Sequence, residues 1–140
     1  AVPVFHSEEY QFEIGKGVTL REGSDCSIIA TGLCVSEALA AADTLAEQGI
    51  HAEVINIHTI KPLDEELVVK TAKKTGRVFT VEEHSIIGGL GAAVAETLGK
   101  MPDKDYQNRC QRCLWRIRSG KRTSSQIRTG CRGNRKPHPA

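Results

Sequence analysis

Two acids and a histidine stand at the end of a β-branched stretch, directly before a glycine-rich turn. Glu82, Glu83 and His84 follow residues 78–81, which read Val-Phe-Thr-Val. In open α/β sheets, functional sites usually lie just beyond the carboxyl ends of the strands. These three side chains could therefore contact a partner domain or ligand near a site. The alternative is a solvated or helix-capping cluster, and the sequence leaves both interpretations open.

Two glycine-containing turns are candidates for binding an anion. Gly88 and Gly89 precede a helical pattern, and Thr31 and Gly32 precede another. Backbone N–H groups at a helix N-terminus attract anions such as phosphate. However, the glycine spacing is not the dinucleotide-binding fingerprint, and no acid lies at the ribose distance. Tight turning, which glycine tolerates at little cost, is the alternative in the first case, and an ordinary strand-to-helix connection is the alternative in the second.

A third pair of polar residues, His58 and Lys61, follows another β-branched stretch. Either side chain could contact a partner domain or an acidic group, and Pro62 marks the start of the next helix. We predict no catalytic residue and no metal ligand among the residues of this chain. The candidate residues are therefore expected to make contacts rather than to perform chemistry.

Hydrophobic periodicity predicts the elements that position these residues. Strands are expected at 18–22, 26–30, 51–57 and 77–82, and helices at 35–48, 64–75 and 91–100. Strands that alternate with helices form an α/β fold with three αβα layers and a mostly parallel sheet. One more strand would normally follow the last helix, and none is readable there, so we expect the final strand to be missing.

Charge divides the 140 residues into two parts. Residues 1–100 contain 8 Lys and Arg against 15 Asp and Glu, whereas residues 101–140 contain 11 against 2. We divide the chain into a linker segment (1–16), an α/β domain (17–100) and a basic tail (101–140). No apolar run could span a bilayer and no signal-peptide pattern is present, so we expect a cytoplasmic protein without a membrane partner.

The five cysteines follow the same division. Cys26 and Cys34 have apolar or small neighbours and are predicted to be buried thiols. The others lie in the basic tail, where they could form a Cys₃His zinc site with one histidine; these residues are Cys110, Cys113, Cys131 and His138. This pattern offers an alternative of another class, a zinc-tailed module that binds nucleic acid. Charge alone also allows the tail to bind polyanions non-specifically.

Four segments, taken in order, resemble the C-terminal domain of the transketolase family. They are residues 12–17 (Phe-Glu-Ile-Gly-Lys-Gly), 28–32 (Ile-Ile-Ala-Thr-Gly), 54–66 (Val-Ile-Asn-Ile-His-Thr-Ile-Lys-Pro-Leu-Asp-Glu-Glu) and 80–91 (Thr-Val-Glu-Glu-His-Ser-Ile-Ile-Gly-Gly-Leu-Gly). The resemblance covers roughly residues 10–100. It is closest to transketolases whose C-terminal half is a separate subunit. Deoxyxylulose-phosphate synthases and the E1 β-subunits of 2-oxo acid dehydrogenases share the domain and are alternatives.

The resemblance implies a specific role. The family transfers two-carbon ketol units between sugar phosphates with thiamine diphosphate and Mg²⁺, which are bound by two other domains. The third domain, which this chain resembles, has one antiparallel strand in its sheet, packs on the other two and helps to form a homodimer. No residue of the thiamine site is recognisable here. We therefore expect an inactive fragment that binds no cofactor itself and whose partners are the thiamine-binding domains or subunit.

The basic tail departs from the family pattern. The family continues with a last strand, a Phe-Gly-Glu-Ser-Gly motif and a terminal helix. The codons tgc ctt tgg cga atc cgg for residues 113–118, read one base later, encode Ala-Phe-Gly-Glu-Ser. Residues 127–134 can be shifted in the same way to Tyr-Gly-Leu-Asp-Ala-Glu-Ala. We interpret the tail after about residue 103 as a frameshift product that is disordered.

Overall fold

The computed structural model describes residues 12–85, 87–101 and 114–118. The helices are α1 (Cys34–Ala46), α2 (Glu65–Thr75) and α3 (Leu90–Gly99). The strands are β1 (Val18–Arg21), β2 (Cys26–Ala30), β3 (Ala52–Asn56), β4 (Val78–Glu82) and β5 (Leu114–Arg118). Each helix and each of the first four strands lies within about two residues of its predicted position.

The strands form one mixed sheet in the order β1-β3-β2-β4-β5. Strands β3, β2, β4 and β5 run parallel to one another, and β1 pairs antiparallel with β3 at one edge. The predicted α/β fold with a mostly parallel sheet and one antiparallel strand is confirmed. Because β2, β3 and β4 run in the same direction, the loops that follow them meet at one edge of the sheet, which we call the carboxyl edge.

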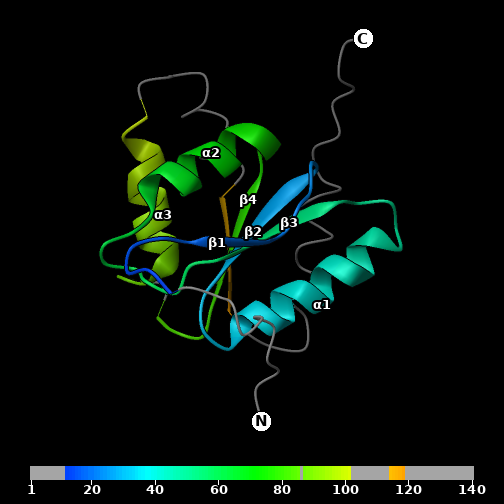
Figure 1. Cartoon of the computed structure of the whole chain (residues 1–140), viewed down its shortest axis with the longest axis horizontal. Helices are drawn as coiled ribbons and strands as arrows, with labels where there is room; N and C mark the ends of the chain where they lie inside the picture. The colour runs from blue at the N-terminus through cyan, green and yellow to red at the C-terminus, as the bar shows by residue number, and fades with distance from the viewer. Residues whose placement is uncertain (1–11, 86, 102–113, 119–140) are drawn as a thin grey trace.

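Helices cover both faces of the sheet (Figure 1). On one face, α1 packs against Ile28 and Phe79, both fully buried. On the other face, α2 and α3 pack against Ile29 and Ile55. Alternate residues of a strand point to opposite faces, so a strand buried on both sides is apolar almost throughout. The predicted burial of the thiols of Cys26 and Cys34 is also confirmed.

Helix α2 begins and ends where its sequence predicts. Asp64 caps its N-terminus by accepting a hydrogen bond from the Leu67 amide at 3.1 Å, and Gly76 ends the helix with φ at +67°. The second Asp64 oxygen accepts from the Gly17 amide at 3.0 Å. This bond fastens the segment before β1 to the loop that leads into α2.

The start of α1 has no side-chain cap. Leu33 occupies the N-cap position. Ser36, whose residue type could cap a helix, lies within the first turn and donates its hydroxyl to the Leu33 carbonyl at 2.9 Å. Serine hydroxyls often bond to a carbonyl one turn back when they lie inside a helix.

The prediction that the final strand is missing is wrong. Strand β5 pairs parallel with β4, with Leu114 opposite Val78 and Arg118 opposite Glu82. The prediction for residues 114–118 was based on the charge of the tail and on the absence of the family motif. Its Leu-Trp-Arg-Ile-Arg pattern nevertheless has the aromatic and β-branched residues that favour strands, and without β5 that side of β4 would leave backbone groups unpaired.

The rest of the basic tail lies outside the described residues. Its predicted disorder, its reading frame and the possible zinc set of Cys110, Cys113, Cys131 and His138 all fall there and stay predictions. Among the residues that the structure describes, no helix combines the length and the apolar character that a membrane crossing requires.

Candidate functional site

The sheet brings all the candidate residues of the sequence to its carboxyl edge. Thr31 and Gly32 follow β2, His58 and Lys61 follow β3, and the segment 82–89 ends β4 and leads into α3. In the sheet, β2 lies between β3 and β4, so the three loops are neighbours. The edge is therefore assembled from segments far apart in the sequence.

Glu82 is used inside the domain. Its side chain is buried, and its two carboxylate oxygens accept from the Leu90 amide at 2.6 Å and the Gly91 amide at 3.0 Å. These amides belong to the first turn of α3, where the helix dipole favours negative charge. Of the two interpretations that the sequence left open, the geometry of Glu82 matches helix capping.

The Gly88–Gly89 turn lies beside this carboxylate. A Cβ atom at Gly89 would come within 2.1 Å of Glu82 Oε2 and 2.7 Å of the Ser85 carbonyl oxygen. The glycine therefore allows the backbone to approach the buried acid. Two amides of the first turn of α3 donate to the chain's own Glu82. Binding of an external anion at Gly88 and Gly89 stays a prediction.

Glu83 and His84 are both exposed, unlike their neighbour Glu82. Strand β4 ends at Glu82, and Glu83 and His84 lie in the loop beyond the buried strand. Their predicted contact with a partner domain stays a prediction. The structure thus divides a triplet that looked uniform in the sequence into one internal residue and two surface residues.

His58 packs against the segment that precedes β1. Its ring lies 4.5 Å, centroid to centroid, from the ring of Phe12, and its Nδ1 is 3.0 Å from the Thr59 hydroxyl. The histidine is half-buried in this position. The contact with Phe12 was not predicted, because nothing local in the sequence indicates that residues 46 positions apart meet.

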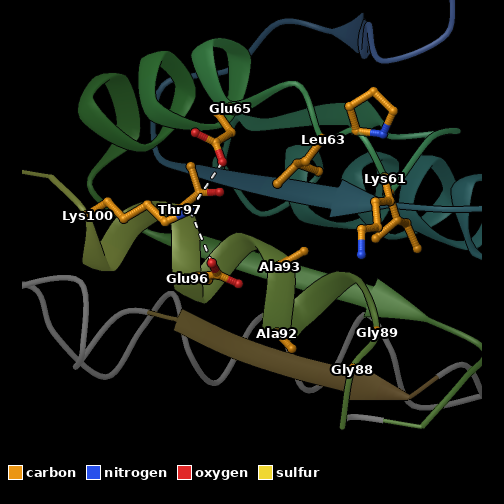
Figure 2. Close-up of a pocket in the computed structure, with 12 residues that line it drawn as sticks. Lys61, Leu63, Glu65, Gly88, Gly89, Ala92, Ala93, Glu96, Thr97 and Lys100 are labelled. Atoms are coloured by element: carbon orange, nitrogen blue, oxygen red, sulfur yellow. Dashed lines mark ion pairs between the residues drawn. The ribbon is translucent and has the colours of Figure 1, made fainter.

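Lys61 is exposed at one end of a cleft of about 540 Å³ between the β3–α2 loop and α3. Figure 2 shows Lys61 and Gly89 on opposite sides of that end, with Ala92 and Ala93 further along α3. At the other end Lys100 pairs with Glu96 and Glu65, and hydrogen bonding to Glu96 raises the pKa of Lys100. The cleft therefore has small residues along one wall and charged residues at its ends.

Thr31 and Gly32 form the turn between β2 and α1. The Thr31 amide donates to the Val81 carbonyl at 3.3 Å, and Gly32 adopts a φ of +58°. The turn needs glycine because L-residues rarely adopt this conformation. The geometry accounts for both residues as parts of a connection, and anion binding here stays a prediction.

A second polar cluster lies near the opposite end of the strands. Glu53, almost fully buried, receives a hydrogen bond from the Ser27 hydroxyl at 3.0 Å and an ion pair from Lys74 at 2.8 Å. Thr71 also donates to Glu53, and Lys74 also pairs with Glu22. The carboxylate is satisfied on all sides by α2 and β2, so this cluster fastens the helix to the sheet.

This cluster predicts a pH dependence of stability. Hydrogen bonding and charge attraction from Lys74 lower the pKa of Glu22 below 4.5, and hydrogen bonds from Glu22 and Glu53 raise the pKa of Lys74 above 10.5. The stabilisation of the fold by ionised Glu22 is present above pH 4.5 and is lost as the pH falls through the pKa of Glu22 in the folded state. The stabilisation by protonated Lys74 is present below pH 10.5 and is lost as the pH rises through the pKa of Lys74 in the folded state. In urea unfolding, the free energy of unfolding that Lys74→Met loses relative to wild type should therefore be largest between pH 4.5 and pH 10.5.

Lys73→Met is the matched control, since Lys73 is exposed on the same helix and makes no ion pair with an acid in the described part of the chain. The difference in free energy of unfolding between wild type and Lys74→Met should become smaller as the pH is lowered from about 7 to about 3. The corresponding difference for Lys73→Met should stay constant. An equal loss for Lys74→Met at both pH values would contradict the assignment.

The described residues do not fit a diphosphate-bound magnesium ion. Magnesium of this kind is held by carboxylates and other oxygen ligands. Within residues 12–85, 87–101 and 114–118, no three His, Cys, Asp or Glu side chains come together in a way that could hold a metal ion.

Comparison with known proteins decides the family. The family model described as "Transketolase, C-terminal domain" matches residues 15–127, more than half of the chain. This chain belongs to the transketolase C-terminal domain family. The resemblance seen in the four sequence segments is thereby confirmed, and the domain's fold agrees with it.

Relatives of known description carry the same domain. The chain is 58% identical over 94 residues to the 6-deoxy-6-sulfo-D-fructose transketolase subunit SqwH of Clostridium sp. strain MSTE9, covering 67% of this chain and 29% of that subunit. It is 52% identical over 85 residues to 1-deoxy-D-xylulose-5-phosphate synthase of Heliobacterium modesticaldum, covering 61% of this chain and 13% of the synthase. The synthase branch, an alternative in the sequence analysis, thus appears among the relatives.

A solved structure supports the same assignment. The chain matches one described as "Split gene transketolase, inactive beta4 tetramer", with a TM-score of 0.75 and 37% identity. The match covers 92% of this chain and 40% of that one. This transketolase C-terminal domain therefore spans less than half the length of the relatives that it matches.

Proposed function

We propose that this domain is the C-terminal part of a split transketolase and that it supports ketol transfer without performing it. The observation that carries the proposal is the 58% identity to a transketolase subunit over 94 residues, which make up only 29% of that subunit. A domain this similar to one part of a larger enzyme is expected to have the same role in its own enzyme. Two-carbon ketol transfer between sugar phosphates would then be the activity of the whole enzyme.

The chemistry of the carboxyl edge supports a positioning role. Glu82, its most buried acid, is already bonded to α3, and His58 packs against Phe12. Both residues therefore make contacts inside the domain. We infer that thiamine diphosphate and Mg²⁺ are held by the preceding domains, and that this domain contributes by keeping them in the productive arrangement.

A domain exchange tests the proposal. In the clostridial subunit, the 94 matched residues would be replaced by their counterparts from this chain. Assayed with its partner subunit, thiamine diphosphate, Mg²⁺ and 6-deoxy-6-sulfo-D-fructose, the hybrid should retain kcat/KM within about tenfold of the parent, since a supporting domain affects positioning rather than chemistry. A subunit truncated before this domain is the control and should be inactive.

Two results would contradict the proposal. One is a hybrid that folds and assembles yet shows no ketol transfer. The other is turnover of a ketose donor, or tight binding of thiamine diphosphate, by the 140-residue chain alone.

A deoxyxylulose-phosphate synthase is the second candidate, because a synthase relative is 52% identical over 85 residues. The same domain exchange in the Heliobacterium synthase distinguishes the transketolase proposal from the synthase alternative. Under our proposal, the transketolase host should retain the larger fraction of its parent activity. The E1 β-subunit branch, a cytoplasmic location and a zinc-dependent role for the tail stay predictions.

Self-association is part of the proposal. The similar split-gene structure is described as a β4 tetramer, which supports assembly of such subunits with one another. The homodimer implied by the family resemblance would be one form of this assembly.

A further inference from the structure

One end of the cleft between the β3–α2 loop and α3 has a cation without an acidic partner. Lys61 lines this end and pairs with no acid among the residues that the structure describes. Figure 2 shows its amino group pointing toward α3. An ammonium group that makes no internal ion pair can form a charge-assisted hydrogen bond with a ligand. This end of the cleft therefore favours a ligand with a negatively charged group.

The other end of the cleft has the opposite charge. Lys100 pairs there with Glu96 at 3.1 Å and with Glu65 at 3.5 Å, so two carboxylates share one ammonium group. One negative charge is therefore in excess at this end, whereas Lys61 provides one positive charge at the first end. A ligand that matches both ends carries an anionic group at Lys61 and a cationic group near the two acids.

Thr97 places a polar group in the cleft that the domain itself does not use. The residue is only 4% exposed and lines the cleft, and its hydroxyl makes no hydrogen bond to any residue that the structure describes. Figure 2 shows its side chain directed from α3 toward α2, across the cleft. The hydroxyls of Thr44 and Thr75, by contrast, donate to the carbonyl one helical turn back. A nearly buried hydroxyl without a partner is unfavourable, and a ligand that bonds to it would remove that cost.

Between its charged ends the cleft has apolar walls. Ile60 and Leu63 on the loop and Ala92 and Ala93 on α3 are all half-buried there. An apolar body placed between them would remove these side chains from water. The volume of about 540 Å³ lies within the range of small-molecule sites, which is roughly 300–1,000 Å³.

The distance between the two ends sets the length of the ligand. Glu96 follows Gly89, which faces Lys61, by two helical turns, and two turns of α-helix rise about 11 Å. An extended peptide of three residues spans about 10 Å. A molecule of this length can contact both ends of the cleft at the same time.

We propose that this cleft binds an elongated zwitterion with an apolar middle, such as a peptide of three small or apolar residues with free ends. The carboxylate of the ligand pairs with Lys61, its ammonium group pairs with Glu96, and the Thr97 hydroxyl bonds to a peptide group between them. The proposal is independent of the proposed function, because it concerns a ligand that is neither a sugar phosphate nor a coenzyme.

The test titrates the 140-residue chain with the peptide Ala-Leu-Ala and follows the amide chemical shifts by NMR. The signals of Gly88, Gly89 and Ala93, which line the cleft, should move and reach saturation. Two modified peptides, the N-acetyl form and the C-terminal amide, each lack one of the two charges. Each should bind about fivefold more weakly than the free peptide, because each loses one exposed ion pair.

Variants of the chain assign the two ends. Lys61→Met should bind the free peptide and its amide equally well, because the partner of the carboxylate is gone, while the N-acetyl form should still bind more weakly. Lys73→Met is the matched control, since Lys73 is an exposed lysine of α2 outside the cleft, and it should bind all three peptides as wild type does. Thr97→Val should weaken all three about fivefold, because it removes one hydrogen bond. Lys61 is exposed, so its variant keeps the test decisive even if Thr97→Val does not fold.

Three results would overturn the proposal. The first is the absence of a saturable shift of the cleft signals at the solubility limit of Ala-Leu-Ala. The second is equal binding of the free peptide and its amide to the wild-type chain. The third is a Lys61→Met variant in which amidation weakens binding as much as it does in wild type. The activity of the domain-exchange hybrid tests the proposed function alone, so the two proposals can fail separately.

Discussion

Replacing Glu82 with alanine is expected to lower the free energy of unfolding by about 3 kcal/mol, because hydrogen bonds from buried donors to a charged acceptor are among the strongest in proteins. The substitution removes the acceptor of the Leu90 and Gly91 amides in a buried position. The Leu90 and Gly91 amides at the start of α3 would then lose the hydrogen-bond acceptor that Glu82 provides. The loss should appear in urea unfolding of the 140-residue chain at neutral pH.

Glu83→Ala is the matched control, because Glu83 is the next residue along the chain and is exposed. It should change stability by less than about 0.5 kcal/mol, as is usual for surface substitutions. Glu82→Gln keeps the shape but not the charge, and it should fall between the two. Equal unfolding midpoints for Glu82→Ala and Glu83→Ala would show that the cap is not made by Glu82.

Gly23→Ala should be about as damaging, with an expected loss of about 3 kcal/mol, since forcing atoms into a filled space costs this much when the neighbours cannot move. A Cβ at Gly23 would lie 2.3 Å from the Ala52 carbonyl carbon and 2.3 Å from the Glu53 amide nitrogen. Both are backbone atoms of β3, so no side-chain rotation can relieve the clash. The strand would have to move away from the turn between β1 and β2.

Gly99→Ala provides a control of opposite sign. Gly99 is the last residue of α3, and a Cβ there meets no atom within 4 Å. Alanine has the higher helix propensity, so this variant should gain about 0.5 kcal/mol. Thermal unfolding of the two glycine variants side by side measures both effects. A Gly23→Ala protein as stable as wild type would mean that the turn does not pack against β3 as described.

Glu82 also bears on function. Glu82 fixes the start of α3, and with it one side of the carboxyl edge. An interface needs its loops held in place, because ordering them on binding would reduce the affinity. The same carboxylate that resembled a functional acid in the sequence thus holds the start of α3 in place.

Most of the fold could be predicted from local patterns. The β-branched runs at 26–30 and 78–82, the acids at the start of α2 and its terminal Gly76 each specify their element within a few residues. Local backbone preferences act over one or two turns, so they are visible in the sequence. Strand β5 was missed because whether a short, charged segment forms a strand depends on its partner β4, which lies more than thirty positions away.

The sequence indicated where in the fold the candidate residues lie, but not which of them are buried. Every candidate residue lies at or beyond a carboxyl strand end, as their positions after predicted strands indicated. Glu82, Glu83 and His84 could not be told apart in the sequence, because burial depends on which face of the sheet α3 covers. The pairing of Phe12 with His58 likewise follows from the path of the whole chain.

The sequence by itself determined the helices, the first four strands, their alternation into an α/β sheet and the family, because these depend on residue periodicity and on motifs in order. Only the tertiary structure decided that the carboxylate of Glu82 belongs to α3 and that Lys61 and Thr97 line one cleft. Those facts depend on distances between segments remote in the chain. Such distances are fixed by packing around the whole core rather than by any local preference.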